Sequence, residues 1–121
     1  MTGGNLSAGE VILIDHKPLG EPFAEKVRPA LVVSGSTFNK TGLDAIVVAL
    51  SSVVRHSDSR QIVIQETDQF FSETGLKTTS AVKCGALFAY PKSQIRRKLG
   101  RVPKAVINQV RTLIISFLAD D

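Results

Sequence analysis

Ala45-Ile46-Val47-Val48-Ala49-Leu50 carries the strongest strand signal in the chain, and it ends on two serines, Ser51 and Ser52. Short runs of β-branched and other apolar residues between polar turn residues are typical of strands. Similar runs lie on both sides of it, at residues 11–14, 30–33 and 61–65. The sequence therefore predicts a sheet built from short strands.

The second of these strands is preceded by an irregular segment. Residues 16–26 contain two prolines and a glycine, which break regular structure, so we expect a loop long enough to carry function. Pro29 is expected to permit a strand only at its start, so that the strand begins at Ala30. Arg28 precedes this proline and is therefore held extended at the exit of the loop.

The C-terminal part of the chain changes from strands to a helix. Residues 80–84 and 86–90 predict a last pair of strands or one bent strand, with Gly85 at the bend. From Pro103 onward the apolar residues recur with the period of a helix, at Val106, Ile107, Val110, Leu113, Ile114, Phe117 and Leu118. The prediction is an α+β fold: a small twisted antiparallel sheet or partly open barrel with a C-terminal amphipathic helix packed against it.

Size and composition limit the classes of protein that fit. With 121 residues, 43% of them hydrophobic, the chain is sized for a single domain, residues 1–121, with a real core. No apolar run approaches the roughly 20 residues of a membrane span, and the N-terminus lacks the pattern of a secretory signal, so we expect a cytoplasmic protein without a membrane partner. One cysteine and two histidines cannot supply a usual four-ligand zinc set, and no metal is expected.

Charge is segregated along the chain. Residues 1–76 hold six Lys/Arg and nine Asp/Glu, whereas residues 77–121 hold nine Lys/Arg and only two Asp. The simple interpretation is a solvated face that keeps a small protein soluble. Complete segregation over more than forty residues favours a polyanionic partner, nucleic acid in particular.

Signatures of several enzyme classes are absent: the chain has no Walker-type phosphate loop, no GxSxG elbow and no HExxH. What remains are polar residues near predicted strand ends, namely Arg28, Ser51, Ser52, His56, Thr78, Thr79 and Lys83. Their spacing in the sequence does not by itself show that these side chains lie close together in the fold. Ordinary turn chemistry and solvated surface charge are the alternative interpretations.

Five segments in register resemble the MazF/PemK (Kid-like) toxin family of type II toxin–antitoxin systems. The resemblance covers about residues 8–118 and leaves residues 1–7 as an expected flexible lead. It is carried by Gly9–Ile14, Val27–Ser34 with Phe38-Asn39, Ile46–Ser52, Gly75–Cys84 and Gly100–Val110.

This resemblance implies an SH3-like barrel of the plasmid-maintenance toxin type, a homodimer, and an endoribonuclease that cuts single-stranded RNA and is silenced by a cognate antitoxin. The implied reaction uses no cofactor and no metal. The ribose 2′-oxygen attacks the adjacent phosphorus and leaves a 2′,3′-cyclic phosphate and a 5′-hydroxyl. Such a step requires a base, an acid, and cations or donors for the crowded phosphate.

Family roles can be carried over to individual residues. Arg28 matches the arginine of the Arg-Pro motif and is the first candidate for a catalytic residue, since its planar, permanently charged fork suits a phosphate under attack. Ser51 falls where the family usually has threonine. Lys83-Cys84-Gly85 replaces the Arg-Cys-Asp of the Kid-like branch, so that the cation is kept and the carboxylate is missing.

Two outcomes of that departure are open. In one hypothesis His56 is a replacement base, because histidine is the side-chain type that changes charge near neutral pH, although a lone histidine in a polar turn is usually just solvated. In the other, the protein is a catalytically impaired member that binds RNA, an antitoxin or DNA gyrase. The candidate RNA-binding residues are Ser52, Thr78, Thr79, Arg96, Arg97 and Lys98, the last three of which could equally attract an acidic antitoxin segment.

Overall fold

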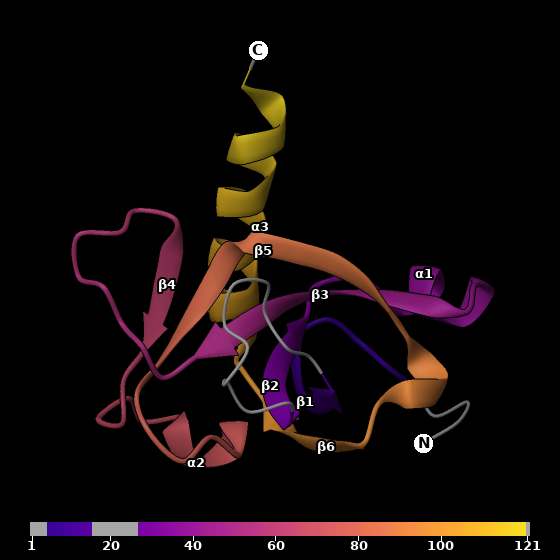
Figure 1. Ribbon diagram of the computed structural model, residues 1–121, viewed down its shortest axis with the longest axis horizontal. Coiled ribbons are helices and arrows are strands. Elements are labelled where there is room, and N and C mark those ends of the chain that lie inside the picture. Colours follow the sequence, from indigo (N-terminus) through magenta and orange to yellow (C-terminus); the bar gives the residue numbers. More distant parts are fainter. Residues whose placement is uncertain (1–4, 16–26, 121) are drawn as a thin grey trace.

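A computed structural model of the chain describes residues 5–15 and 27–120 (Figure 1). The expected loop at 16–26, including its two prolines, lies outside the described residues, and so does most of the expected flexible lead. The strands are β1 (Glu10–Asp15), β2 (Val27–Val32), β3 (Asp44–Ser51), β4 (Gln61–Ile64), β5 (Ser80–Pro91) and β6 (Arg97–Arg101). The helices are α1 (Ser36–Thr41), α2 (Phe71–Thr74), the 3-10 turn η1 (Lys92–Gln94) and α3 (Lys104–Ala119).

The strands form one six-stranded antiparallel sheet in the order β4-β5-β3-β2-β1-β6. The run that carries the strongest strand signal is β3, which lies between β5 and β2. Pro29 lies inside β2, opposite Leu13 of β1, so the expectation that it only opens the strand is wrong. The pairing of β2 with β3 is recorded only from Ala30 onward, so Pro29 lies at the end of that ladder.

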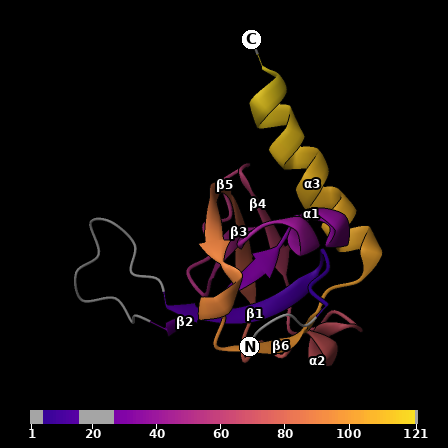
Figure 2. The ribbon, with the colours of Figure 1, turned by 90° about the vertical axis from the view of Figure 1, so that its right-hand side faces the viewer.

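Of the two arrangements expected for residues 80–90, a pair of strands or one bent strand, the structure has one long bent strand, β5. Its register with β3 jumps from Leu87 opposite Val48 to Lys83 opposite Ala49, which leaves residues 84–86 without partners on β3. This bulge contains Gly85, where the bend was expected. Because the first half of β5 also pairs with β4, the bend lets the sheet curl, as Figures 1 and 2 show.

Alternating side chains divide the interior into two cores. On one face of the sheet, residues such as Leu31, Val48 and Val82 pack with Ile107 and Val110 of α3. On the other, Ile12, Val32 and Val47 pack with Tyr90 and Ile95, among others. Both faces of β3 are therefore covered along most of its length, which explains its nearly continuous apolar sequence.

Helix α3 extends beyond the sheet at its C-terminal end (Figure 2). The part of the helix up to Ile114 buries Ile107, Val110 and Ile114, as the apolar period predicts. The same stripe continues through Phe117 and Leu118, but these side chains are 38% and 73% exposed because the sheet does not reach them. The described part of the chain thus leaves an apolar helix end uncovered.

The α+β class, the curled antiparallel sheet and the C-terminal helix are confirmed. Strand β6, helix α2 and the turn η1 have no counterpart in the predictions. Strand β6 reads Arg-Lys-Leu-Gly-Arg, which lacks apolar alternation because it is an edge strand with exposed side chains. Helix α2 is a single turn of four residues, too short for any helical period to show.

Candidate active site

Arg28 and Ser51 face the same side of the sheet at one end of β2 and β3. Ala30 of β2 lies opposite Ala49 of β3. Because side chains alternate along a strand, Arg28 and Ser51, each two residues beyond this pair, lie on the same face of the sheet as the pair. Arg28 is opposite Ile14 of β1, whose side chain belongs to the second core. The two candidate residues therefore border the end of this core, where the apolar side chains give way to polar ones.

Lys83 joins them on that face from β5. It lies opposite Ala49, one row from Ser51, and its Nζ donates a 2.9 Å hydrogen bond to Oε1 of Gln61, the first residue of β4. Gln61 in turn donates from Nε2 to the backbone carbonyl of Arg55 at 2.7 Å. We call the surface of Arg28, Ser51, Lys83 and Gln61 the candidate face.

A carboxylate stands beside this face. Asp58, in the loop from β3 to β4, accepts hydrogen bonds from the backbone N–H of Arg60 at 2.9 Å and from Arg60 Nε at 3.4 Å. The pKa of Asp58 is lowered, first by the backbone hydrogen bond from Arg60 and further by the charges of Arg60 and Lys83. Asp58 is therefore a stable anion near Lys83, and its low pKa makes it a weak proton acceptor.

The serine and histidine candidates differ in how they are held. Ser51 Oγ accepts a 3.0 Å hydrogen bond from the backbone N–H of Val53, so its own hydroxyl hydrogen remains able to donate to a ligand. This is the strand-end turn geometry that was the alternative interpretation. Ser52 and His56 are exposed in the loop that follows β3, with His56 in a turn.

Thr78 and Thr79 lie just before β5, at the same end of the sheet as Ser51. Thr78 Oγ1 donates to Oε2 of Glu66 at 3.2 Å, and Thr79 Oγ1 accepts from the backbone N–H of Glu66 at 3.0 Å. Both side chains are thus engaged by one acidic residue, whose charge disfavours RNA phosphate at this point.

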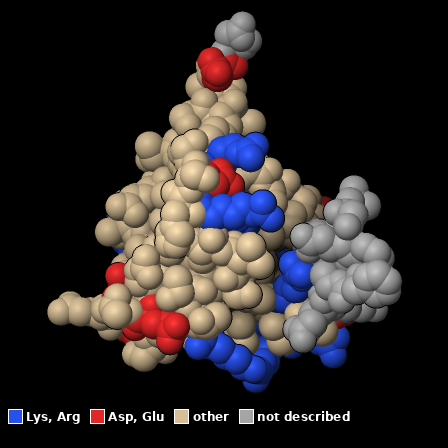
Figure 3. Space-filling view, turned by 60° about the vertical axis from the view of Figure 1, so that its left-hand side comes forward, with Lys and Arg blue, Asp and Glu red and all other residues tan. Residues whose placement is uncertain are grey.

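The three basic residues at 96–98 lie on or beside β6, which is separated from β2 by β1. Two of them are paired: Arg96 Nη1 lies 2.9 Å from Oδ1 of Asp15, and Lys98 Nζ lies 2.9 Å from Oε2 of Glu10. Arg97 is exposed. On the face drawn in Figure 3, basic side chains form separate groups with acidic and uncharged residues between them. The segregation of charge along the sequence thus does not produce one continuous basic surface there.

Cys84 and Gly85, which follow Lys83 in the motif that differs from the Kid-like pattern, lie in different environments. Cys84 is buried in the core beneath α3, and burial raises the pKa of its thiol to about 11. Gly85 is exposed in the β5 bulge, and a Cβ added there would meet nothing within 4 Å. There is therefore open space at the position where the resemblance to the family implies a carboxylate.

The sequence predictions included Lys83 but missed its hydrogen-bond partner Gln61 and the nearby Asp58. Gln61 faces Lys83 only because of the register between β4 and β5, which no local pattern specifies. Asp58 carries a turn signature, Ser57-Asp58-Ser59, but its proximity to Lys83 follows from the return of the chain into β4.

Two classes of partner can be assessed on the described part of the chain. No helix within residues 5–15 and 27–120 has the length and apolar character needed to cross a bilayer. Over those same ranges, no three of the His, Cys, Asp and Glu side chains gather as a metal-binding group.

Comparison with known proteins gives a family and a fold. Residues 7–118 match the sequence model of the family described as PemK-like, MazF-like toxin of type II toxin–antitoxin system. No curated protein sequence matches the chain at a significant level. Among solved structures, MazF from Deinococcus radiodurans superposes with a TM-score of 0.75 at 18% identity, over 98% of this chain and 100% of that chain.

Two mycobacterial structures are similar as well. One is an endoribonuclease in complex with its cognate antitoxin, with a TM-score of 0.71 at 21% identity over 96% of this chain and 97% of that one. The other is the Mycobacterium tuberculosis toxin MazF-mt6, with a TM-score of 0.70 at 15% identity over 93% and 98%. At these identities the structural likeness shows a shared fold.

Proposed function

The chain belongs to the family of PemK-like, MazF-like toxins of type II toxin–antitoxin systems, and from this we propose that it is a metal-independent endoribonuclease that cleaves single-stranded RNA. The observation that carries the proposal is the placement of Arg28, Ser51 and Lys83 on one face of the sheet in adjoining rows. Solved structures of the same fold are named as endoribonucleases, which supports the same activity here.

The proposed reaction is transesterification. The ribose 2′-oxygen attacks the adjacent phosphorus while its proton leaves to a base, and the 5′-oxygen departs and takes up a proton, leaving 2′,3′-cyclic phosphate and 5′-hydroxyl ends. Arg28 is proposed to bind the phosphate oxygens with its guanidinium. Lys83 supplies a second cation, fixed by Gln61, and Ser51 donates its hydroxyl hydrogen to the same group.

The proton acceptor is the weak point of this face. Asp58 is a poor base because its pKa is lowered, and position 85 has no side chain. His56, in the neighbouring loop, is the remaining candidate base. These features favour slow cleavage over a fast reaction.

The openness at Gly85 also supports a second candidate function. Without a carboxylate at that position, the face could hold an RNA strand, an antitoxin segment or gyrase without cutting anything. In this alternative Arg28 and Lys83 contribute to binding affinity and not to a rate.

The partners follow from the family. We propose a homodimer in which a second copy covers the exposed apolar end of α3, at Ile115, Phe117 and Leu118. A cognate antitoxin is proposed as the inhibitor, since one similar structure is named as such a complex. A cytoplasmic location, where mRNA is available, is part of the same proposal.

One experiment separates the two functions. Purified protein is incubated with a long single-stranded RNA in the presence of EDTA, and the fragment ends are mapped. Cyclic-phosphate and 5′-hydroxyl ends that disappear in the Arg28→Ala variant support the endoribonuclease. Intact RNA that is nevertheless retained by the wild-type protein overturns it in favour of the binding module.

A further inference from the structure

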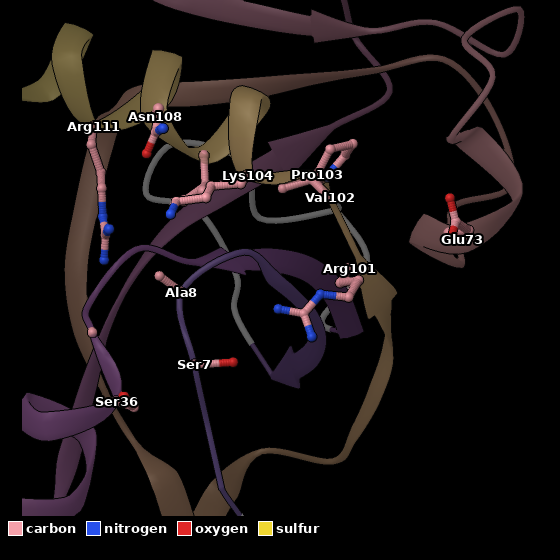
Figure 4. A pocket seen from close by; sticks show the side chains of 12 residues that line it. Ser7, Ala8, Ser36, Glu73, Arg101, Val102, Pro103, Lys104, Asn108 and Arg111 are labelled. Carbon is pink, nitrogen blue, oxygen red and sulfur yellow. The ribbon is translucent and has the colours of Figure 1, made fainter.

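A second polar region lies away from the candidate face. It is a cavity of about 750 Å³ between the start of α3, the end of β6 and the segment that leads into α1. Arg101 points into it from β6, and Lys104 and Arg111 point into it from α3 (Figure 4). We call this the cationic cavity. Asn108 and Ser36 also line it.

The three cations are not neutralised by the protein. Over residues 5–15 and 27–120, no carboxylate oxygen lies within 4.0 Å of Arg101, Lys104 or Arg111. The residue opposite Arg101 in the sheet is Glu10, but its carboxylate is bound by Lys98 at 2.9 Å and by Ser7. Glu73 lines the cavity but lies apart from the three cations in Figure 4.

One of the cations, Arg111, is anchored to the backbone. Arg111 Nε donates a 3.0 Å hydrogen bond to the backbone carbonyl of Val33. This bond uses one donor of the guanidinium and leaves its terminal nitrogens to reach the cavity. Three like charges around one hollow repel one another, and an anion in the middle would relieve that repulsion.

We propose that the cationic cavity binds a phosphate group, either of a free phosphate compound or at the end of a nucleic acid strand. A phosphate monoester carries about −1.5 to −2 charges and three acceptor oxygens, which matches three cations with an amide and a hydroxyl beside them. A single carboxylate would leave most of the positive charge uncompensated. Guanidinium forks also fit phosphate oxygens in a bidentate way.

This site is distinct from the candidate face. Arg28 is at the start of β2, whereas Gly35 and Ser36, which line the cavity, follow the end of that strand. The strand from Arg28 to Val32 alone spans about 13 Å, and the chain then continues beyond it to Gly35. Phosphate binding in the cavity therefore does not depend on whether the candidate face cleaves RNA.

The test measures binding without cleavage. Inorganic phosphate and a 5′-phosphorylated single-stranded DNA, which has no 2′-hydroxyl to react, are titrated into the ¹⁵N-labelled full chain at fixed ionic strength. Amide shifts are expected at Gly35 and along the first turns of α3. The Arg101→Gln/Lys104→Gln double variant, in which both changed side chains are exposed, should weaken phosphate binding at least tenfold. Lys77→Gln, an exposed lysine outside the cavity, should not change it.

Each result decides the proposal. Binding of inorganic phosphate alone assigns the cavity to a free phosphate compound, and binding of both probes at the same amides assigns it to a strand end as well. Unchanged affinity in the double variant overturns the proposal. The proposal is also overturned if a glutamate-rich peptide shifts these amides and neither phosphate probe does. Arg28→Ala should retain binding, so loss of cleavage and loss of phosphate binding are read separately.

Discussion

The candidate face and the cationic cavity both present basic side chains, but they differ in whether these side chains have polar or acidic neighbours. On the candidate face, Lys83 is bound by Gln61 and stands near the anionic Asp58. In the cavity, three cations share a hollow and no described carboxylate pairs with them. The first arrangement fixes the position of the lysine side chain, whereas the second leaves three cations without an acidic partner among the described residues.

The two regions also differ in how the chain builds them. The candidate face is a product of strand register: residues on neighbouring strands share a face because side chains alternate. The cavity is formed where three segments distant in sequence meet around the start of α3. Substitutions on the candidate face should therefore change rates, and substitutions in the cavity should change only anion binding.

The largest effect is expected from Arg28→Ala. Removing a donor to the phosphate under attack costs about 100-fold or more in rate. RNA cleavage and growth arrest should both be lost, while circular dichroism and the oligomeric state stay unchanged. Lys77→Ala, which removes an exposed cation elsewhere, serves as the control. Undiminished cleavage by Arg28→Ala would remove this residue from the mechanism and leave the candidate face without a distinguishing role.

A gain of activity is expected from Gly85→Asp. The new side chain enters open space, and the backbone at Gly85 does not have a positive φ, so the fold should tolerate it. A carboxylate able to take a proton should raise the cleavage rate about tenfold, below the full contribution of an optimised base. Gly85→Asn, of similar size but unable to accept a proton at neutral pH, should leave the rate low. Equal rates for the two variants would contradict the missing-base interpretation.

His56→Ala is expected to change little. The side chain is exposed in a turn, and its removal should leave both the cleavage rate and the pH profile as they are. If His56 is instead the base, the rate falls by about 100-fold and the acidic limb of the profile disappears. Single-turnover cleavage from pH 5 to 9 distinguishes the two outcomes.

The smallest functional effect is expected at Cys84, next to Lys83 but directed into the opposite core. Because burial raises the thiol pKa from 9.0 to about 11, the native protein should resist iodoacetamide at pH 8 and react only when unfolded. The neutral thiol stabilises the fold fully below about pH 9, and this contribution is lost as pH rises to about 11. Urea unfolding of wild type and Cys84→Ala over this range measures it. Rapid native alkylation would contradict the burial.

Much of the fold could be predicted from local sequence because the apolar runs at 45–50 and from Val106 onward are strongly periodic. The bend in β5 was also predictable, since Gly85 interrupts an otherwise apolar stretch. Strand β6 could not be predicted, because its pairing with β1 comes from the tertiary arrangement and not from its charged sequence. For Phe117 and Leu118 the helical period was right, but burial depends on where the sheet ends.

The candidate site, like the fold, could be predicted from the sequence only in part. Arg28, Ser51 and Lys83 could be singled out because each lies at or near the end of a recognisable strand or in a familiar motif. Their roles in catalysis stay predictions. The ion pairs of Arg96 and Lys98 depend on acidic residues far away in sequence, which a run of positive charges cannot reveal. The contacts of Thr78 and Thr79 with Glu66 depend on how the chain folds back between these residues.

The close approach of α2 to β6 restricts which residues this chain can carry at two glycine positions. A Cβ on Gly100 would lie 2.1 Å from the carbonyl oxygen of Glu73, and one on Gly75 would lie 2.2 Å from that of Leu99. Gly75 also has a φ of +74°. In a saturation library selected only for soluble protein, both positions should tolerate no replacement, although neither belongs to a binding surface. Intolerance to mutation at these two glycines would therefore report on backbone clearance and should not be mistaken for a sign of function.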